Sequence, residues 1–213
     1  MISDHVEQYL ESLRPKRAEL IEEMERYARD HHIPIMEQTS LAVMLQVMSF
    51  LNPDRILEIG TAIGYSAIRM AEMMPETEIV TVERDEARYH EAVSNVEKAG
   101  YAHRIKILFG DAFELSQELK SHGPYQSLFI DAAKGQYKRF FDEFYGSLQP
   151  QGVIFSDNIL FRGMVAEEEI EEKRFRSMVK KLREYNEFLM SHPSLDTTIY
   201  PIGDGLAVSK KNS

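Results

Sequence analysis

The chain has 213 residues, of which 43% are hydrophobic and 28% charged, and this is typical of a globular α/β protein with a full core. It contains no cysteine, which excludes a disulfide framework and thiolate chemistry. The formal net charge of −10 argues against generic nucleic-acid binding, although a local basic patch remains compatible with it.

The sequence predicts neither a secretory signal peptide nor a membrane-spanning helix. Met1–Leu13 carries three acids and no apolar run, unlike a signal peptide. The longest apolar stretch, Leu41–Leu51, is too short to cross a bilayer. We therefore expect a cytoplasmic protein with no membrane partner. We also expect a single domain over residues 1–213, with N-terminal helices in 1–50 and an α/β core in 51–213.

Helical spacing of apolar residues predicts three helices before the core. The first covers about Ser3–Leu13, the second follows Pro15 and ends near residues 31–34, and the third covers about Ser40–Phe50. The breaker Asn52-Pro53 ends this part.

Short apolar segments then alternate with helical ones. The expected strands are Arg55–Ile59, Glu78–Glu83, Arg104–Phe109, Tyr125–Asp131, Val153–Ser156, Thr197–Ile202 and Leu206–Lys210. The expected helices are Gly64–Met74, Asp85–Ala99, Ala112–Ser121, Gln136–Leu148 and Glu167–Ser191. This order predicts an α/β fold with a seven-stranded, mostly parallel sheet, an antiparallel C-terminal hairpin strand and helices on both faces. Ligands of such sheets bind beyond the carboxyl ends of the strands.

Glycines and acids follow the first three expected strands. The turn Glu58–Ser66 holds Gly60 and Gly64 just before a helix, where the backbone can approach a ligand and the helix N-terminus favours anions. Glu83 ends the second strand, where a carboxylate can accept hydrogen bonds from both ribose hydroxyls. Asp111 either caps the next helix or approaches an adenine amino group. Together these residues favour a nucleoside cofactor over a plain turn followed by a solvated acid.

Three oxygen-bearing side chains follow the fourth and fifth strands. Asp131 ends the fourth, and Asp157 and Asn158 end the fifth. Sequential strands are usually adjacent, so these side chains should converge. Hard oxygen ligands are what Mg²⁺ requires, and three protein ligands leave positions for water and substrate. The alternative is an Asx turn at Asp157-Asn158.

In this order, the motifs resemble the cation-dependent O-methyltransferases, which include the catechol and caffeoyl-CoA O-methyltransferases. The resemblance covers about Met36 to Lys210 and rests on Glu58-Ile-Gly-Thr-Ala-Ile-Gly-Tyr-Ser66, Glu83, Gly110-Asp111-Ala112, Asp131-Ala-Ala-Lys134 and Asp157-Asn158. It implies a Rossmann-like S-adenosylmethionine-dependent methyltransferase fold. Relatives of this size are commonly dimers, so it also implies a homodimer.

The resemblance assigns roles position by position. Asp131, Asp157 and Asn158 would bind Mg²⁺, and Lys134 is the candidate general base, unless it is a surface lysine at a helix start. The residues that would contact S-adenosylmethionine are Met36, Gly60, Ser66, Glu83, Asp111, Ala112 and Asp131.

Four further segments are similar to the bacterial branch of this family that methylates tRNA. They are His32-Ile-Pro-Ile-Met36, Phe129-Ile-Asp-Ala-Ala-Lys-Gly-Gln-Tyr137, Asp157-Asn-Ile-Leu-Phe161 and Pro201-Ile-Gly-Asp-Gly-Leu-Ala-Val-Ser209. The implied reaction converts 5-hydroxyuridine to 5-methoxyuridine at the wobble position, with the base splayed out of the tRNA anticodon loop.

Two alternatives to a tRNA substrate stay open. A metal with open positions favours any acceptor with two adjacent oxygens, so small catechols or hydroxycinnamoyl esters fit the same site. A nucleoside-binding regulatory module without turnover would not need the full Asp131, Asp157 and Asn158 set.

The charges of the expected helix Glu167–Ser191 have two interpretations. Five acids precede six bases, an order that complements the helix dipole. Four of the bases fall on one face and could instead contact phosphates: Lys173, Arg176, Lys180 and Arg183. Further candidates for RNA contact are Arg14, Lys16, Arg17, Lys138 and Arg139. Without the resemblance to the tRNA branch, the dipole interpretation is favoured.

Overall fold

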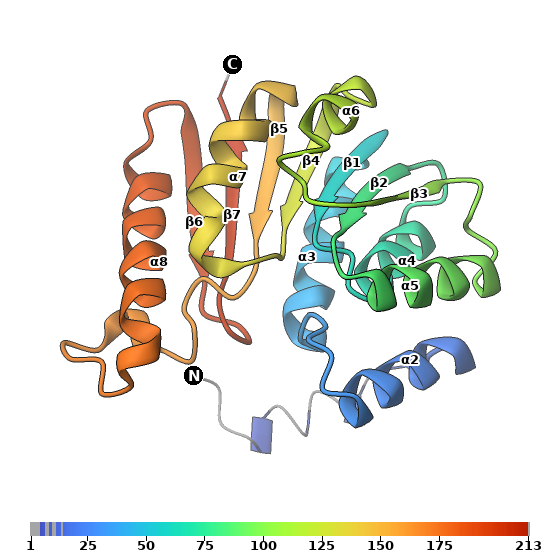
Figure 1. The fold of residues 1–213 in the computed structure, drawn as a ribbon, viewed down its shortest axis with the longest axis horizontal. Coiled ribbons are helices and arrows are strands. Elements are labelled where there is room, and N and C mark those ends of the chain that lie inside the picture. Colours follow the sequence, from blue (N-terminus) through green and yellow to red (C-terminus); the bar gives the residue numbers. More distant parts are fainter. Residues whose placement is uncertain (1–4, 7–8, 10–11, 14, 213) are drawn as a thin grey trace.

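The computed structural model describes residues 5–6, 9, 12–13 and 15–212, so the first expected helix lies largely outside the described residues (Figure 1). The α-helices are α2 Glu19–Asp30, α3 Gln38–Leu51, α4 Tyr65–Met73, α5 Glu86–Lys98, α6 Ser116–Ser121, α7 Tyr137–Phe144 and α8 Lys173–Ser191. The short 3₁₀ helices are η1 Lys134–Gln136, η2 Tyr145–Ser147 and η3 Met164–Ala166. The strands are β1 Arg55–Ile59, β2 Glu78–Glu83, β3 Ile105–Phe109, β4 Tyr125–Ile130, β5 Leu148–Ser156, β6 Leu195–Tyr200 and β7 Leu206–Lys211.

The strands form one seven-stranded sheet in the order β3-β2-β1-β4-β5-β7-β6. The pairs from β3 to β5 are parallel, and β7 runs antiparallel to both β5 and β6. The predicted fold class, with its antiparallel C-terminal strand, is confirmed. The strand order reverses between β1 and β4, and ligands of open α/β sheets bind at such a switch point.

Alternation along the strands divides the core between the two faces of the sheet. Ile56 of β1 packs in a cluster with α2, α3 and α4, whereas Leu57 packs in a second cluster with α7 and α8. Successive side chains of a strand point to opposite faces, so the near-continuous apolar strands serve both layers. Figure 1 shows α7 and α8 together on the side of the sheet away from α3. In the part of the chain that the structure describes, no helix is both long and apolar enough to span a bilayer.

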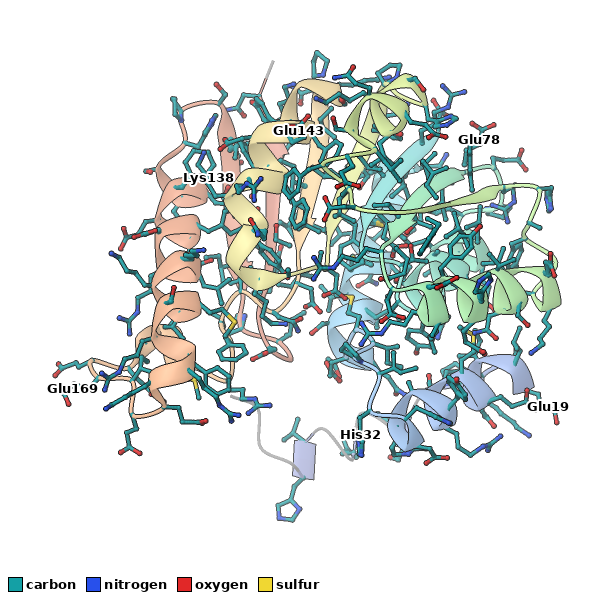
Figure 2. All side chains as sticks on the ribbon, in the orientation of Figure 1. Glu19, His32, Glu78, Lys138, Glu143 and Glu169 are labelled. Atoms are coloured by element: carbon teal, nitrogen blue, oxygen red, sulfur yellow. The ribbon has the colours of Figure 1, made fainter. Side chains whose placement is uncertain are left out.

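The predicted helix Glu167–Ser191 is wrong at its beginning. α8 starts at Lys173, and the acidic residues before it form a loop, on which Glu169 is exposed (Figure 2). Arg176 and Arg183 donate hydrogen bonds to backbone carbonyls of this loop, which holds it against the helix instead of letting it extend the helix. The dipole interpretation therefore fails, because the first turn of α8 carries cations rather than acids.

Two other helices are shorter than predicted. The helix expected from Ala112 starts only at Ser116, because the Asp111 carboxylate accepts a hydrogen bond from Phe113 N at 2.9 Å and closes a turn first. The helix expected to reach Leu148 ends at Phe144 and continues as η2 into β5.

Candidate active site

A cavity of about 730 Å³ opens at the switch point, beyond the carboxyl ends of β1, β2 and β4. Residues predicted for the site that line it are Gly60, Glu83, Asp111, Ala112, Asp131, Lys134 and Asn158. Met36, Ser66 and Asp157 are buried and do not line it, whereas Pro34 and Ile35, beside Met36, do. The predicted cofactor contacts of Met36 and Ser66 stay predictions.

The Glu83 carboxylate is held in place by three backbone amides. One oxygen accepts from Ala62 N at 2.8 Å, and the other accepts from Arg84 N and Asp85 N, both at 2.9 Å. Three hydrogen bonds to backbone leave the carboxylate no freedom to rotate, and its charge makes each of them strong. An acceptor fixed in this way at a cavity wall suits the paired hydroxyls of a ribose.

Gly60 sits where the backbone of β1 meets that of the segment after β4. Its φ is +103°, and a Cβ at this position would lie 2.2 Å from the carbonyl oxygen of Asp131. The neighbouring Ile59 carbonyl accepts from Asp131 N at 3.0 Å. Only glycine allows this approach, so the turn before α4 and the backbone of Asp131 are positioned together.

Glu58 is the centre of a buried polar network. The sequence patterns did not assign this residue a separate role. It lies on the same strand face as Ile56 and is fully buried, and its carboxylate accepts hydrogen bonds from Ser66 and, at 2.6 Å, from Thr81. Thr81 in turn shares a 2.6 Å hydrogen bond with Thr61. Burial raises the pKa of Glu58 to about 7, and the two hydroxyl donors oppose this only in part.

Glu58→Gln is expected to change the pH dependence of stability. A carboxyl whose pKa is raised on folding contributes stability below its ordinary pKa, near pH 4.5, and loses that contribution as the pH rises through about 7. The variant should therefore gain up to about 3 kcal/mol relative to the wild type between pH 5 and pH 8. Urea unfolding at both pH values measures this, with the exposed Glu78→Gln as the control (Figure 2). A constant difference between variant and wild type across this range would contradict the expectation.

Asp131, Asp157 and Asn158 lie close together at one end of the site, as expected from the order of the strands. Burial raises the pKa of Asp131 to about 6. Burial and the nearby charge of Asp131 raise the pKa of Asp157 well above its ordinary value. Lys134 Nζ donates to Asn158 Oδ1 at 2.7 Å, so the candidate base lies at the same cluster. The predicted adjacency of these four side chains holds, and their roles stay predictions.

The Asp157 carboxylate fits a cation. The side chain is buried, and neither of its oxygens has a hydrogen-bond partner among the described residues. An unpaired buried carboxylate is costly unless a proton or a positive charge compensates it. The described residues contain no cluster of three His, Cys, Asp or Glu side chains, so the donor set must include the Asn158 amide oxygen. Two carboxylates and an amide are hard donors of the kind that Mg²⁺ takes.

Two tyrosines that the sequence patterns missed fix this cluster from behind. The Tyr137 hydroxyl donates to the Asp157 backbone carbonyl at 2.9 Å, and Tyr185 shares a 2.8 Å hydrogen bond with Ser156. The two rings contact each other edge to face, with centroids 5.6 Å apart. Both residues are distant from Asp157 along the chain, so no local motif indicated them.

An aromatic and cationic wall closes the other end of the cavity. Phe113 and Phe140 stack with their centroids 4.8 Å apart, and Arg139 lies 4.2 Å above the Phe113 ring. Asp111 Oδ2 is 3.9 Å from Arg84, while Oδ1 closes the turn described above. A flat, partly apolar wall of this kind can take a heteroaromatic ring.

The chain is similar to known O-methyltransferases along almost its whole length. The family model described as O-methyltransferase matches residues 10–212. A crystal structure from Staphylococcus aureus, provisionally identified as a caffeoyl-CoA O-methyltransferase, is 34% identical, with a TM-score of 0.92 and coverage of 98% of this chain and 100% of that chain. The caffeoyl-CoA O-methyltransferase of Stellaria longipes is 29% identical over 98% of this chain and 91% of its own length.

A third relative agrees in fold. The O-methyltransferase from Bacillus cereus, solved in complex with SAH, is 24% identical, with a TM-score of 0.86 and coverage of 98% and 97%. The similarity to the tRNA-methylating branch is not tested by these relatives and stays a prediction. The match of the family model from residue 10 to residue 212 shows that the chain belongs to the O-methyltransferase family.

Proposed function

We propose that the chain is an S-adenosylmethionine- and Mg²⁺-dependent O-methyltransferase that methylates 5-hydroxyuridine at the wobble position of tRNA. The observation that carries the catalytic part is the buried Asp157 carboxylate without a partner among the described residues, beside Asp131, Asn158 and Lys134. The SAH bound to the Bacillus cereus relative supports the choice of cofactor.

In this proposal, residues at one end of the cavity bind the cofactor and residues at the other end bind the cation. The fixed Glu83 carboxylate holds a ribose, and the wall of Phe113 and Phe140 faces its base. Asp131 and Asp157 hold the cation, which when bound lowers the pKa of the acceptor hydroxyl and fixes its direction. The sulfonium of the cofactor already provides a leaving group, so the protein has to orient the acceptor and accept its proton.

Lys134 is the proposed acceptor of that proton. Its Nζ lies 2.7 Å from Asn158 Oδ1, within the proposed ligand cluster. A lysine amine that takes the proton of the acceptor hydroxyl acts as a general base. Lys134→Met is expected to lower kcat about 100-fold. Lys134→Arg should lower it equally, because a guanidinium keeps the charge but does not release a proton.

Steady-state kinetics across pH give the kcat of the wild type and of each Lys134 variant. Lys106→Met is the matched control, because Lys106 is an exposed lysine of β3 that lies near Glu118. Wild-type kcat in Lys134→Arg would assign Lys134 a purely electrostatic role and contradict the proposed base.

The acceptor is proposed from sequence similarity and from charge. The segments similar to the tRNA-methylating branch include Asp157–Phe161 at the site itself. Cations also line the cavity of this acidic protein, namely Arg84, Arg88, Lys134 and Arg139. A polyanionic acceptor would use such a rim. A second candidate, a small catechol or hydroxycinnamoyl thioester, is favoured by the names of the caffeoyl-CoA relatives.

Nucleoside mass spectrometry of tRNA from a deletion strain separates the two candidates. We expect 5-methoxyuridine and nucleosides derived from it to disappear and 5-hydroxyuridine to accumulate. The purified enzyme should then methylate that tRNA and leave caffeoyl-CoA unchanged. An unaltered nucleoside profile together with turnover of caffeoyl-CoA would replace the tRNA proposal by the second candidate.

A further inference from the structure

The loop between β5 and α8, residues 157–172, begins at the proposed metal ligands and contains η3. Three of its non-glycine residues have positive φ: Asn158 at 55°, Phe161 at 42° and Arg162 at 55°. Such conformations cost of order 1 kcal/mol or more each and persist only where surrounding groups impose them. Bonds within the loop support η3, and two sets of contacts from outside the loop add to them.

One set of contacts comes from the turn between β6 and β7. Ile159 N donates to the Gly205 carbonyl at 3.1 Å, and Leu160 N donates to the Asp204 carbonyl at 2.9 Å. The Asp204 carboxylate accepts from Arg162 N. These bonds hold residues 159, 160 and 162 of the loop, and none of them involves Phe161.

The second set comes from one face of α8. Arg183 Nε donates to the Val165 carbonyl at 2.9 Å, and its Nη2 donates to the Met164 carbonyl at 3.3 Å and to the carbonyl of Glu167. Arg176 and Asn186, on the same helix face, donate to the carbonyls of Ile170 and Ile159. Arg183 alone thus binds three of the carbonyls in the part of the loop that the turn does not reach.

The loop carries a buried aromatic side chain beside Lys134, which lines the cavity. Phe161 is only 8% exposed, and its ring centroid lies 6.0 Å from Lys134 Nζ and 5.2 Å from the centroid of Phe175. A shift of the loop would move this ring relative to Lys134 and the ligands at Asp157 and Asn158. A displacement of about 1 Å near reacting groups is enough to impair a reaction substantially.

We propose that Arg183 is a positioning residue for the methyl acceptor. It holds residues 164–167, and Met164 N and Val165 N of this segment donate to the carbonyls of Phe161 and Leu160, so that Arg183 keeps Phe161 against Lys134. This inference rests on the proposed function for its kinetic part. It also replaces the predicted phosphate role of Arg183, whose donors are bound to the loop. The guanidinium spreads its donors over a planar fork, and Arg183 uses both Nε and Nη2, whereas the three donors of an ammonium lie on one atom.

The test compares Arg183→Met and Arg183→Lys with Glu184→Gln, an exposed residue of the same helix that lies near Lys180. Hydrogen exchange of the protein without substrate is the first readout. We expect faster exchange in residues 160–168 of both Arg183 variants and wild-type exchange in the control. Unchanged protection of this segment would overturn the proposal, whichever acceptor the enzyme uses.

Kinetics with tRNA containing 5-hydroxyuridine, and separately with caffeoyl-CoA, form the second readout. For the acceptor that the wild type uses, we expect KM to rise at least 10-fold in both Arg183 variants, while the Kd of SAH changes less than 2-fold. Added guanidinium, but not ammonium at equal ionic strength, should partly restore Arg183→Ala. A wild-type acceptor KM despite a loosened loop, or equal losses for acceptor and SAH, would overturn the proposal. If the wild type methylates neither acceptor, the proposed function fails, and hydrogen exchange alone then decides the anchoring role.

Discussion

Asp157→Ala is expected to reduce methyl transfer by about 1,000-fold, equivalent to about 4 kcal/mol of transition-state stabilisation. The reason is the chemistry of its surroundings. The carboxylate is buried, none of the described residues donates to it, and Asp131 adds a second negative charge nearby. Of the proposed ligands, Asp157 is therefore the one that a bound cation would stabilise most. Single-turnover kinetics in saturating Mg²⁺ measure the loss.

Thermal unfolding gives a second reading of the same substitution. A cation that binds only the folded state raises Tm in proportion to the logarithm of its concentration. We expect this rise in the wild type and its absence in Asp157→Ala. A second variant, Asp157→Asn, should be more stable than the wild type when both are measured in chelator, because an amide removes the cost of an unpaired buried charge.

The control for both experiments is Asp142→Ala, which removes an exposed carboxylate of α7 that pairs with Lys138. It should retain wild-type activity and the Mg²⁺ dependence of Tm. Full methyl transfer by the wild type in chelator, or by Asp157→Ala, would show that the three oxygens do not hold a catalytic cation.

The convergence of Asp131 with Asp157 could be predicted because it depends on local patterns. Each residue follows an apolar strand, and parallel strands joined by helices bring their carboxyl ends to one edge of the sheet. The bounds of β2 were also predicted to the residue, because a short segment rich in β-branched residues favours a strand. Glu83 at its end was then placed at the cavity without further information.

The features that could not be predicted depend on contacts between distant segments. Nothing in the acidic run before Lys173 indicates a loop, since glutamates are good helix formers, and its conformation depends on Arg183, more than a dozen residues later. The tyrosines behind Asp157 are equally remote. Glu58 was part of a sequence motif, but only the fold shows that Thr81 of β2 and Ser66 of α4 both donate to it.

Gly60→Ala is expected to destabilise the fold by about 4 kcal/mol and to disrupt the site at the same time. A Cβ at Gly60 would lie 2.2 Å from the Asp131 carbonyl oxygen and 2.9 Å from its carbonyl carbon, so the backbone of one or the other segment must move by about 1 Å. The positive φ adds about 1 kcal/mol for any residue with a Cβ. Because the displaced atoms belong to Asp131, binding of both SAH and Mg²⁺ should weaken.

Gly100→Ala separates the two contributions. Gly100 follows α5, has a φ of +78° and would place its Cβ with nothing within 4 Å, so this variant carries the conformational cost without the collision. It should lose about 1 kcal/mol in urea unfolding and keep wild-type binding of SAH in calorimetry. Equal losses of stability in the two variants, with SAH binding intact in Gly60→Ala, would mean that the backbone of Asp131 can yield without cost. The close approach of these two chain segments would then not be what positions the site.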